Sequence, residues 1–438
     1  MNDPRTPASG TPAEHPLRYK LNNELHARPP VALRSPQVVS YVALVHDGAT
    51  AEAEIAHLRH LAEAFAVPLP EVDGDHLLLV TPRFKLKWER HTEFSCYTIF
   101  RELTGNEGEH ATAEEALPPR WLEAIPGRLL VGTHVDLRDA GQVTPESVIA
   151  AATREGSQMI ATRVAEGGAW VFTDFLLTDG WTRFLVLDEK LTPRQTGRMV
   201  QRLLEIETYR MTALLAFPVA KEVGRLLNRA EGELADLMDQ IVDAATPEDE
   251  RRVLTRLTRL AADVERSVSR STFRFGAAAA YHRLVQNRIE ELREVRVSGF
   301  TTIREFMDRR LAPAINTCAA NARRQEDLSG RIARNSQLLR TRVDIELERQ
   351  NQELLAQMNR RAKLQLRLQE TVEGLSVVAI TYYASQLVQY LAKGAKGLIA
   401  PLSPELITAI SIPVIGVTVA LGLHRMRKSL AAAEGDHE

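Results

Sequence analysis

Two long uncharged stretches near the C-terminus constrain the fold of this chain more than any other feature. The first runs from Gly374 to Ala392 and the second from Leu406 to Leu423. At 1.5 Å per residue, helices of this length span roughly 27 to 29 Å, close to the roughly 30 Å hydrocarbon core of a bilayer. The pair predicts a transmembrane hairpin within residues 372–424. The alternative is a buried hairpin in a soluble core, which the flanking basic residues disfavour.

Basic residues around the two stretches predict the orientation of this hairpin. Only Lys393 and Lys396 lie in the connection between the stretches. The outer flanks carry Arg360, Arg361, Lys363, Arg367, Arg425, Arg427 and Lys428. By the positive-inside rule, both chain ends then face the cytoplasm, and residues 425–438 form a basic and then acidic cytoplasmic tail.

Polar and small residues within the stretches predict helix contacts. In the first stretch, polar side chains at i, i+4, i+7 and i+11 share one helix face, which should meet protein or water because polar groups facing lipid are costly. These residues are Tyr382, Gln386, Gln389 and Lys393. In the second stretch, Gly416 and Ala420 form a small-x-x-x-small pair that lets another helix approach closely. Glutamines that bond between helices and glutamines that line a pore remain alternatives.

The N-terminal part mixes strand and helix periodicities. Residues 1–16 are rich in proline and predict a disordered tail, and residues 17–191 predict an α+β cytoplasmic domain with a largely antiparallel sheet. Asp179-Gly180 is a hairpin signal between the last two strands. The expected strands are 38–46, 76–81, 85–100, 128–137, 158–164, 170–177 and 183–187.

Residues 192–371 predict a long α-helical, coiled-coil-like stalk. The expected helices cover 192–244, 247–297 and 301 onward to the membrane. In the last helix, apolar residues recur every eleven positions and form a stripe. Its members are Leu328 and Leu339, then Ile332, Val343 and Leu354, then Leu347 and Met358. This spacing is typical of a nearly straight helix bundle, such as one formed between copies of the chain. An amphipathic helix that folds back on its own neighbours shows the same stripe.

One expected strand holds the clearest cluster of chemistry-bearing residues. Glu89, His91 and Glu93 alternate along the strand, which places them on one face. Two carboxylates and an imidazole are a ligand set for a divalent cation, or they raise the histidine pKa. A solvated strand face shows the same alternation and is the commoner case.

Charge and motifs exclude several classes of function. Lys and Arg total 55 and Asp and Glu total 57, so the net charge of −2 gives no sign of a nucleic-acid partner. Cys96 and Cys318 are far apart in the sequence, which excludes a disulfide framework and a thiolate zinc site and fits a reducing compartment. The sequence has no phosphate-binding loop, dinucleotide fingerprint or nucleophile elbow, so we expect no enzyme.

Four segments carry a resemblance to a known family. They are YKLNNELHARPP from Tyr19, KWERHTEF from Lys87, GRMVQRLLEIETYRMTALLAFP from Gly197 and LQETVEGLSVVAITYY from Leu368. Together they resemble the bacterial domain-of-unknown-function family numbered 3422, described as uncharacterised membrane-anchored proteins. The likeness covers the chain after Glu14. It implies a location and an architecture, and it carries over no activity because the family has none assigned.

The architecture also resembles the CorA-type divalent-cation channels. Those proteins carry Gly-Met-Asn at the end of their first span, where this chain reads YLAKG from Tyr390, and Lys393 at the outer mouth would repel cations. We therefore expect a membrane-anchored, self-associating binding or scaffolding module with an unidentified cytoplasmic protein partner. A CorA-like channel or transporter without the signature is the alternative.

Overall fold

The computed structural model describes residues 14–19, 21–22, 29–72, 74–104, 111–155, 159–244, 246–394 and 403–434. The chain forms two compact units. One comprises residues 1–244 and 252–336, and the other comprises residues 245–251 and 337–438. The predicted tail (1–16) and the loop between the two apolar stretches lie largely outside the described residues.

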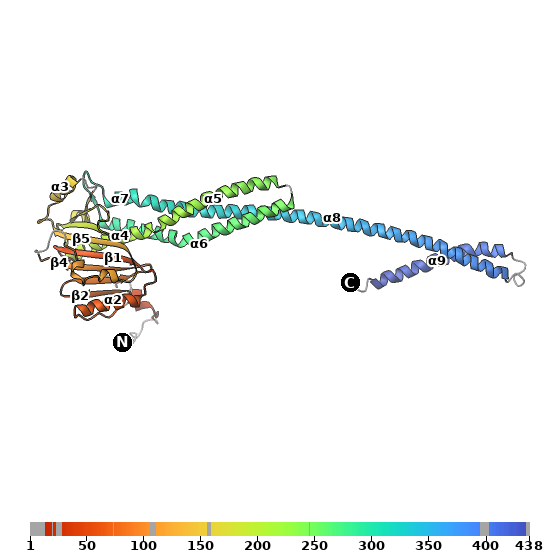
Figure 1. Cartoon of the computed structure of the whole chain (residues 1–438), viewed down its shortest axis with the longest axis horizontal. Coiled ribbons are helices and arrows are strands. Elements are labelled where there is room, and N and C mark those ends of the chain that lie inside the picture. The colour runs from red at the N-terminus through yellow and green to blue at the C-terminus, as the bar shows by residue number, and fades with distance from the viewer. Residues whose placement is uncertain are drawn as a thin grey trace. The chain divides into compact units, whose positions relative to one another are not determined.

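A mixed β-sheet organises the first unit (Figure 1). Its strands within the described residues are β1 (Gln37–Val45), β2 (His76–Val80), β3 (Lys85–Arg90), β4 (Phe94–Glu102), β5 (Arg128–Asp139), β6 (Ile160–Val164), β7 (Ala169–Thr173), β8 (Thr182–Asp188) and β9 (Val295–Arg296). Their spatial order is β2-β3-β4-β1-β5-β8-β7-β6-β9. Only the β5–β8 pair is parallel, so the prediction of a largely antiparallel sheet is confirmed.

Two strand predictions had different outcomes. The single strand expected over 85–100 is wrong, because the chain turns back between β3 and β4, where the backbone N–H of His91 donates to the carbonyl oxygen of Phe94 at 2.8 Å. No Gly, Pro or Asn marks this turn in the sequence. The turn expected at Asp179-Gly180 is confirmed, since both residues have positive φ and the flanking Thr178 and Trp181 pair.

The two sheet faces have different coverings. Along β3, Leu86 and Trp88 point to one face, where helix α2 (Ala51–Ala64) buries Leu58 and Leu61 against them. Lys87 and Glu89 alternate to the other face. Helix α4 (Pro193–Leu214) crosses that second face. Helix α3 (Pro145–Glu155) packs against β6 to β8 on the α2 side of the sheet.

Long helices follow the sheet, as predicted. They are α4, α5 (Ala216–Asp243), α6 (Pro247–Leu292), α7 (Ile303–Arg310), α8 (Ala312–Gly394) and α9 (Pro404–Glu434). The expected continuous helix over 192–244 is wrong in one respect, because it breaks at Leu215. Pro218 has no N–H to donate to the carbonyl of Leu214, so it is accommodated in the first turn of a new helix.

Polar contacts hold α5, α6 and the first part of α8 together in the first unit. Figure 1 shows these helices side by side. The Asn321 side chain donates to the Ala220 carbonyl at 2.6 Å, and the Gln325 amide donates to Ser267 at 3.0 Å. Leu328 and Ile332 of the eleven-residue stripe are buried. This part of α8 therefore packs on its own neighbours, which is the fold-back alternative.

The rest of the stripe and α9 lie in the second unit. Leu354 and Met358 are 57% and 64% exposed. Within the described residues, one helix, Pro404–Arg425, is long and apolar enough to cross a membrane, and none of it is buried. It contains the predicted second stretch. The first stretch continues α8 without meeting that criterion, because its tyrosines and glutamines lower its mean hydropathy.

Candidate functional site

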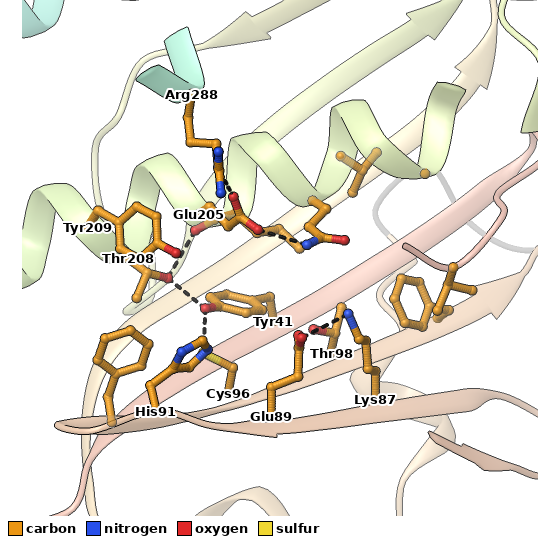
Figure 2. Close-up of a pocket in the computed structure, with 17 residues that line it drawn as sticks. Tyr41, Lys87, Glu89, His91, Cys96, Thr98, Glu205, Thr208, Tyr209 and Arg288 are labelled. Atoms are coloured by element: carbon orange, nitrogen blue, oxygen red, sulfur yellow. Dashed lines mark hydrogen bonds and ion pairs between the residues drawn. The ribbon is translucent and has the colours of Figure 1, made fainter. Parts of the chain in front are cut away.

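A cavity of about 250 Å³ lies between α4 and the sheet in the first unit (Figure 2). The sheet wall comes from β1, β3 and β4, and the opposite wall from α4 and α6. The polar side chains around it are Tyr41, Lys87, Glu89, His91, Cys96, Thr98, Gln201, Glu205, Thr208, Tyr209 and Arg288. We call this space the α4 pocket.

The start of α4 is held in place by local sequence features. Thr192 and Gln195 form a capping box, in which the Gln195 side chain accepts from the Thr192 backbone N–H at 2.9 Å. Pro193 occupies the first helical turn and its carbonyl accepts from Leu33 N–H at 3.0 Å. The chain segment at Val31 crosses α4 at Gly197. A Cβ added at Gly197 would overlap the carbonyl oxygen of Val31, so only glycine allows this crossing.

An ion pair lies on the sheet wall. Lys87 Nζ is 2.9 Å from Glu89 Oε1, and the two side chains are only 8% and 13% exposed. They are two positions apart on β3, which places them on the same face. Thr98 and Cys96 are their cross-strand partners on β4. Figure 2 shows the Thr98 side chain beside this ion pair.

A chain of hydrogen bonds joins the sheet wall to α4. Thr208 donates to the Leu204 carbonyl at 2.9 Å, so it accepts from the Tyr41 hydroxyl at 2.6 Å, and the Cys96 thiol then donates to Tyr41 at 2.8 Å. Burial raises the pKa of both Tyr41 and Cys96. The thiol is therefore protonated and is not an activated nucleophile.

A second ion pair lies on the helix wall. Arg288 of α6 pairs with Glu205 of α4, and Glu205 also accepts from the Gln201 amide at 2.7 Å. Burial, and then the charge of Glu205, raises the pKa of Tyr209, which keeps its hydroxyl neutral. Both walls of the pocket thus carry one cation and one carboxylate that neutralise each other.

The metal cluster predicted from strand alternation, Glu89, His91 and Glu93, does not form. Glu89 and His91 both line the α4 pocket, but Glu93 lies in the turn after β3 and pairs with Arg274 of α6. Within the described ranges, no three His, Cys, Asp or Glu side chains are grouped so that they could hold a metal ion. The hypothesis of a divalent-cation cofactor loses its geometric basis here.

Sequence reasoning missed most of the pocket. Lys87 lies two positions before Glu89 in the sequence, and this strand-like spacing was a signal that both side chains share one face. Tyr41 and Thr208 are 167 positions apart, and nothing local in the sequence pairs them.

A separate buried cluster joins Ser40, His134 and Glu114. Ser40 Oγ accepts from two backbone N–H groups, of Ala113 and Glu114, so its proton is donated to His134 Nδ1 at 2.9 Å. His134 Nε2 faces Glu114 at 3.7 Å. Ser40 is fully buried and bonded in three directions, so it is not placed to attack a substrate.

The residues predicted for helix contacts lie in α8 and α9. Tyr382 and Lys393 are exposed, and Gln386 and Gln389 are half-buried. A Cβ added at Gly416 would lie 3.8 Å from the Thr381 side chain, so Gly416 faces α8 closely, whereas Ala420 is exposed. The buried residues of α8 in this segment, Ser385 and Ala392, each precede a predicted polar-face residue by one position.

Comparison with known protein families shows which family this chain belongs to. The family described as "Protein of unknown function (DUF3422)" matches residues 13–430, and the chain therefore belongs to this family. No curated protein matches the sequence. These comparisons give no support to the likeness with CorA-type channels.

We predict that Lys87 and Glu89 are energetically coupled. Lys87→Met leaves a nearly buried carboxylate without its cation, which should cost about 3 kcal/mol of unfolding free energy. Adding Glu89→Gln to the same chain should recover at least half of that loss, since no charge then stays unpaired. Thermal melting of the full chain in detergent compares the variants. Equal losses in the single and double variants would show that the pair is not coupled.

We predict that His134 makes the stability of the fold sensitive to acid. Burial, and then the nearby Arg183, lowers its pKa from 6.5 to about 4. The unfolded chain therefore binds more protons between these pH values, and the stabilisation present above pH 6.5 is lost as pH falls towards 4, by up to about 3 kcal/mol.

Melting of the wild type and His134→Asn between pH 7 and 4 measures this contribution. Asn keeps an acceptor for Ser40 but does not titrate, so the variant should lose less stability on acidification. A parallel decline in both proteins would refute the assignment, because the loss would then come from groups that both proteins share.

Proposed function

We propose that this chain is a membrane-anchored binding protein whose cytoplasmic α+β unit takes up a small polar molecule in the α4 pocket. The pocket's paired charges carry the proposal. Lys87, Glu89, Glu205 and Arg288 surround a cavity that the protein itself leaves unfilled. Ligand pockets typically combine an apolar lining with a few convergent polar groups of this kind.

The helix Pro404–Arg425 supports the anchoring part of the proposal. Its apolar surface is unburied, as expected of a helix whose solvent is lipid. We propose that residues 374–392 form the first span of a hairpin with it, and that both chain ends face the cytoplasm of a bacterial inner membrane. The basic flanks support this orientation.

Self-association and a non-enzymatic role complete the proposal. The exposed apolar residues Leu347, Leu354 and Met358 of α8 favour pairing with a second copy through the stalk, in a coiled-coil-like manner. The protonated Cys96 favours binding over covalent chemistry. Among the residues that the structure describes, no specific contact favours ion conduction, and Lys393 opposes cation entry.

We predict that anchoring depends on the C-terminal segment. The full chain should stay with vesicles in alkaline carbonate, whereas a variant ending at Arg367 should be released, because it lacks both apolar stretches. A C-terminal tag should be reachable by protease only in inverted vesicles. Release of the full chain by carbonate, or a tag reachable only from the periplasm, would contradict the proposed anchor.

We predict that the α4 pocket binds one class of charged small molecule. L-leucine, succinate, adenosine monophosphate and spermidine represent zwitterions, dicarboxylates, nucleotides and polycations in a calorimetric titration of the full chain in detergent. Gln201→Trp should abolish the binding that is found, since it fills the pocket from the half-buried rim. Arg198→Trp, on the exposed side of α4, is the matched control. Absence of binding by all four probes would refute the pocket's role.

A further inference from the structure

The ion pair on the sheet wall leaves bonding capacity unused. An ammonium group has three N–H donors. Within the described part of the chain, Lys87 Nζ has one ion-pair partner, Glu89, although the side chain is 8% exposed. Thr98 is 4% exposed and its side chain also lines the pocket. Nearly buried donors without acceptors are costly, so an occupant of the pocket that supplies acceptors is favoured.

These donors converge because of strand register. Lys87 and Thr98 are directly paired across β3 and β4, and both side chains line the α4 pocket. Directly paired residues have side chains close together on one sheet face. A carboxylate entering here can accept from both groups, with one oxygen for each donor.

The charge balance of the pocket determines which carboxylate-bearing ligand fits. Lys87 and Arg288 are balanced by Glu89 and Glu205, so a lone anion brings an excess negative charge into a largely buried site, and a lone cation an excess positive one. A molecule that carries both charges avoids this cost. Its ammonium can be bound by Glu89 while its carboxylate is bound by Lys87.

The spacing of the protein charges defines the ligand further. Lys87 Nζ and Glu89 Oε1 are 2.9 Å apart, so the ligand's opposite charges must also be close neighbours. An α-amino acid has this arrangement. The pocket lining also contains apolar side chains, from Phe94, Phe100, Val200 and Leu204. Its small volume favours a molecule of amino-acid size.

We propose that the α4 pocket is a binding site for a free α-amino acid with an apolar side chain. Its carboxylate accepts from Lys87 and Thr98, its ammonium donates to Glu89, and its side chain packs against Phe100 and Leu204. This inference rests on the proposed function and names the class of ligand for the same pocket.

Calorimetry on the full chain in detergent tests the inference with matched probes. L-valine, L-leucine, L-methionine and L-phenylalanine are the amino acids. N-acetyl-L-leucine lacks the ammonium, and 3-methylbutylamine lacks the carboxylate. At least one amino acid should bind, and both leucine analogues should bind at least tenfold more weakly than leucine or not at all.

Two variants locate the carboxylate. Thr98→Val keeps the shape but removes the hydroxyl donor, and it should weaken amino-acid binding about tenfold, while Thr98→Ser should retain it. Neither variant changes a charge, so folding is spared. If Lys87→Met with Glu89→Gln folds, it should abolish binding, and Lys85→Met, on the same strand but outside the pocket, should not.

Each contrary outcome is distinct. Equal or tighter binding of N-acetyl-L-leucine would make the site an anion pocket and overturn the inference. Binding of succinate, adenosine monophosphate or spermidine that Gln201→Trp abolishes, with no amino acid bound, would overturn the inference and leave the proposed function standing. Absence of binding by every probe would overturn both.

Discussion

The packing of α4 across the sheet is the contact on which the rest of the first unit depends. Gly197 admits the crossing segment at Val31, and Thr208 fixes the middle of the helix to the sheet through Tyr41. Glu207 is fully buried and reaches both Thr182 and Arg210. These contacts fix α4 on both sides of the α4 pocket. The helix therefore cannot move closer to the sheet and close the cavity.

Charge pairing explains why such a polar interior is tolerated. Each cation in the α4 pocket has a carboxylate within the described residues, so the desolvation penalty of an isolated charge is avoided. Hydrophobic replacements of the same volume would pack at least as stably. We infer that the paired charges are retained for recognition, since paired groups with spare donors are suited to exchanging partners with a ligand.

The sequence allowed the broad architecture to be predicted, because periodicity is a local property. Glu89 and His91, which alternation placed on one face, both line the α4 pocket, and helical spacing located the long helices. Alternation could not detect the turn at His91, where polar residues without Gly or Pro continue a strand-like pattern. Partners from distant segments, such as Arg288 for Glu205 and Arg274 for Glu93, follow from tertiary packing and leave no local signal.

The polar residues of the first apolar stretch are an argument for the proposed self-association. Ser385 and Ala392 of α8 are buried, while Gln386 and Gln389, on a neighbouring face, are only half-covered. In lipid, an amide without a partner costs several kcal/mol. A solitary hairpin would leave these amides facing hydrocarbon. Pairing with a second copy would supply partners to both glutamines, and the same association would cover the exposed Leu354 and Met358 of the stalk. The apolar and polar faces of α8 therefore both favour the proposed self-association.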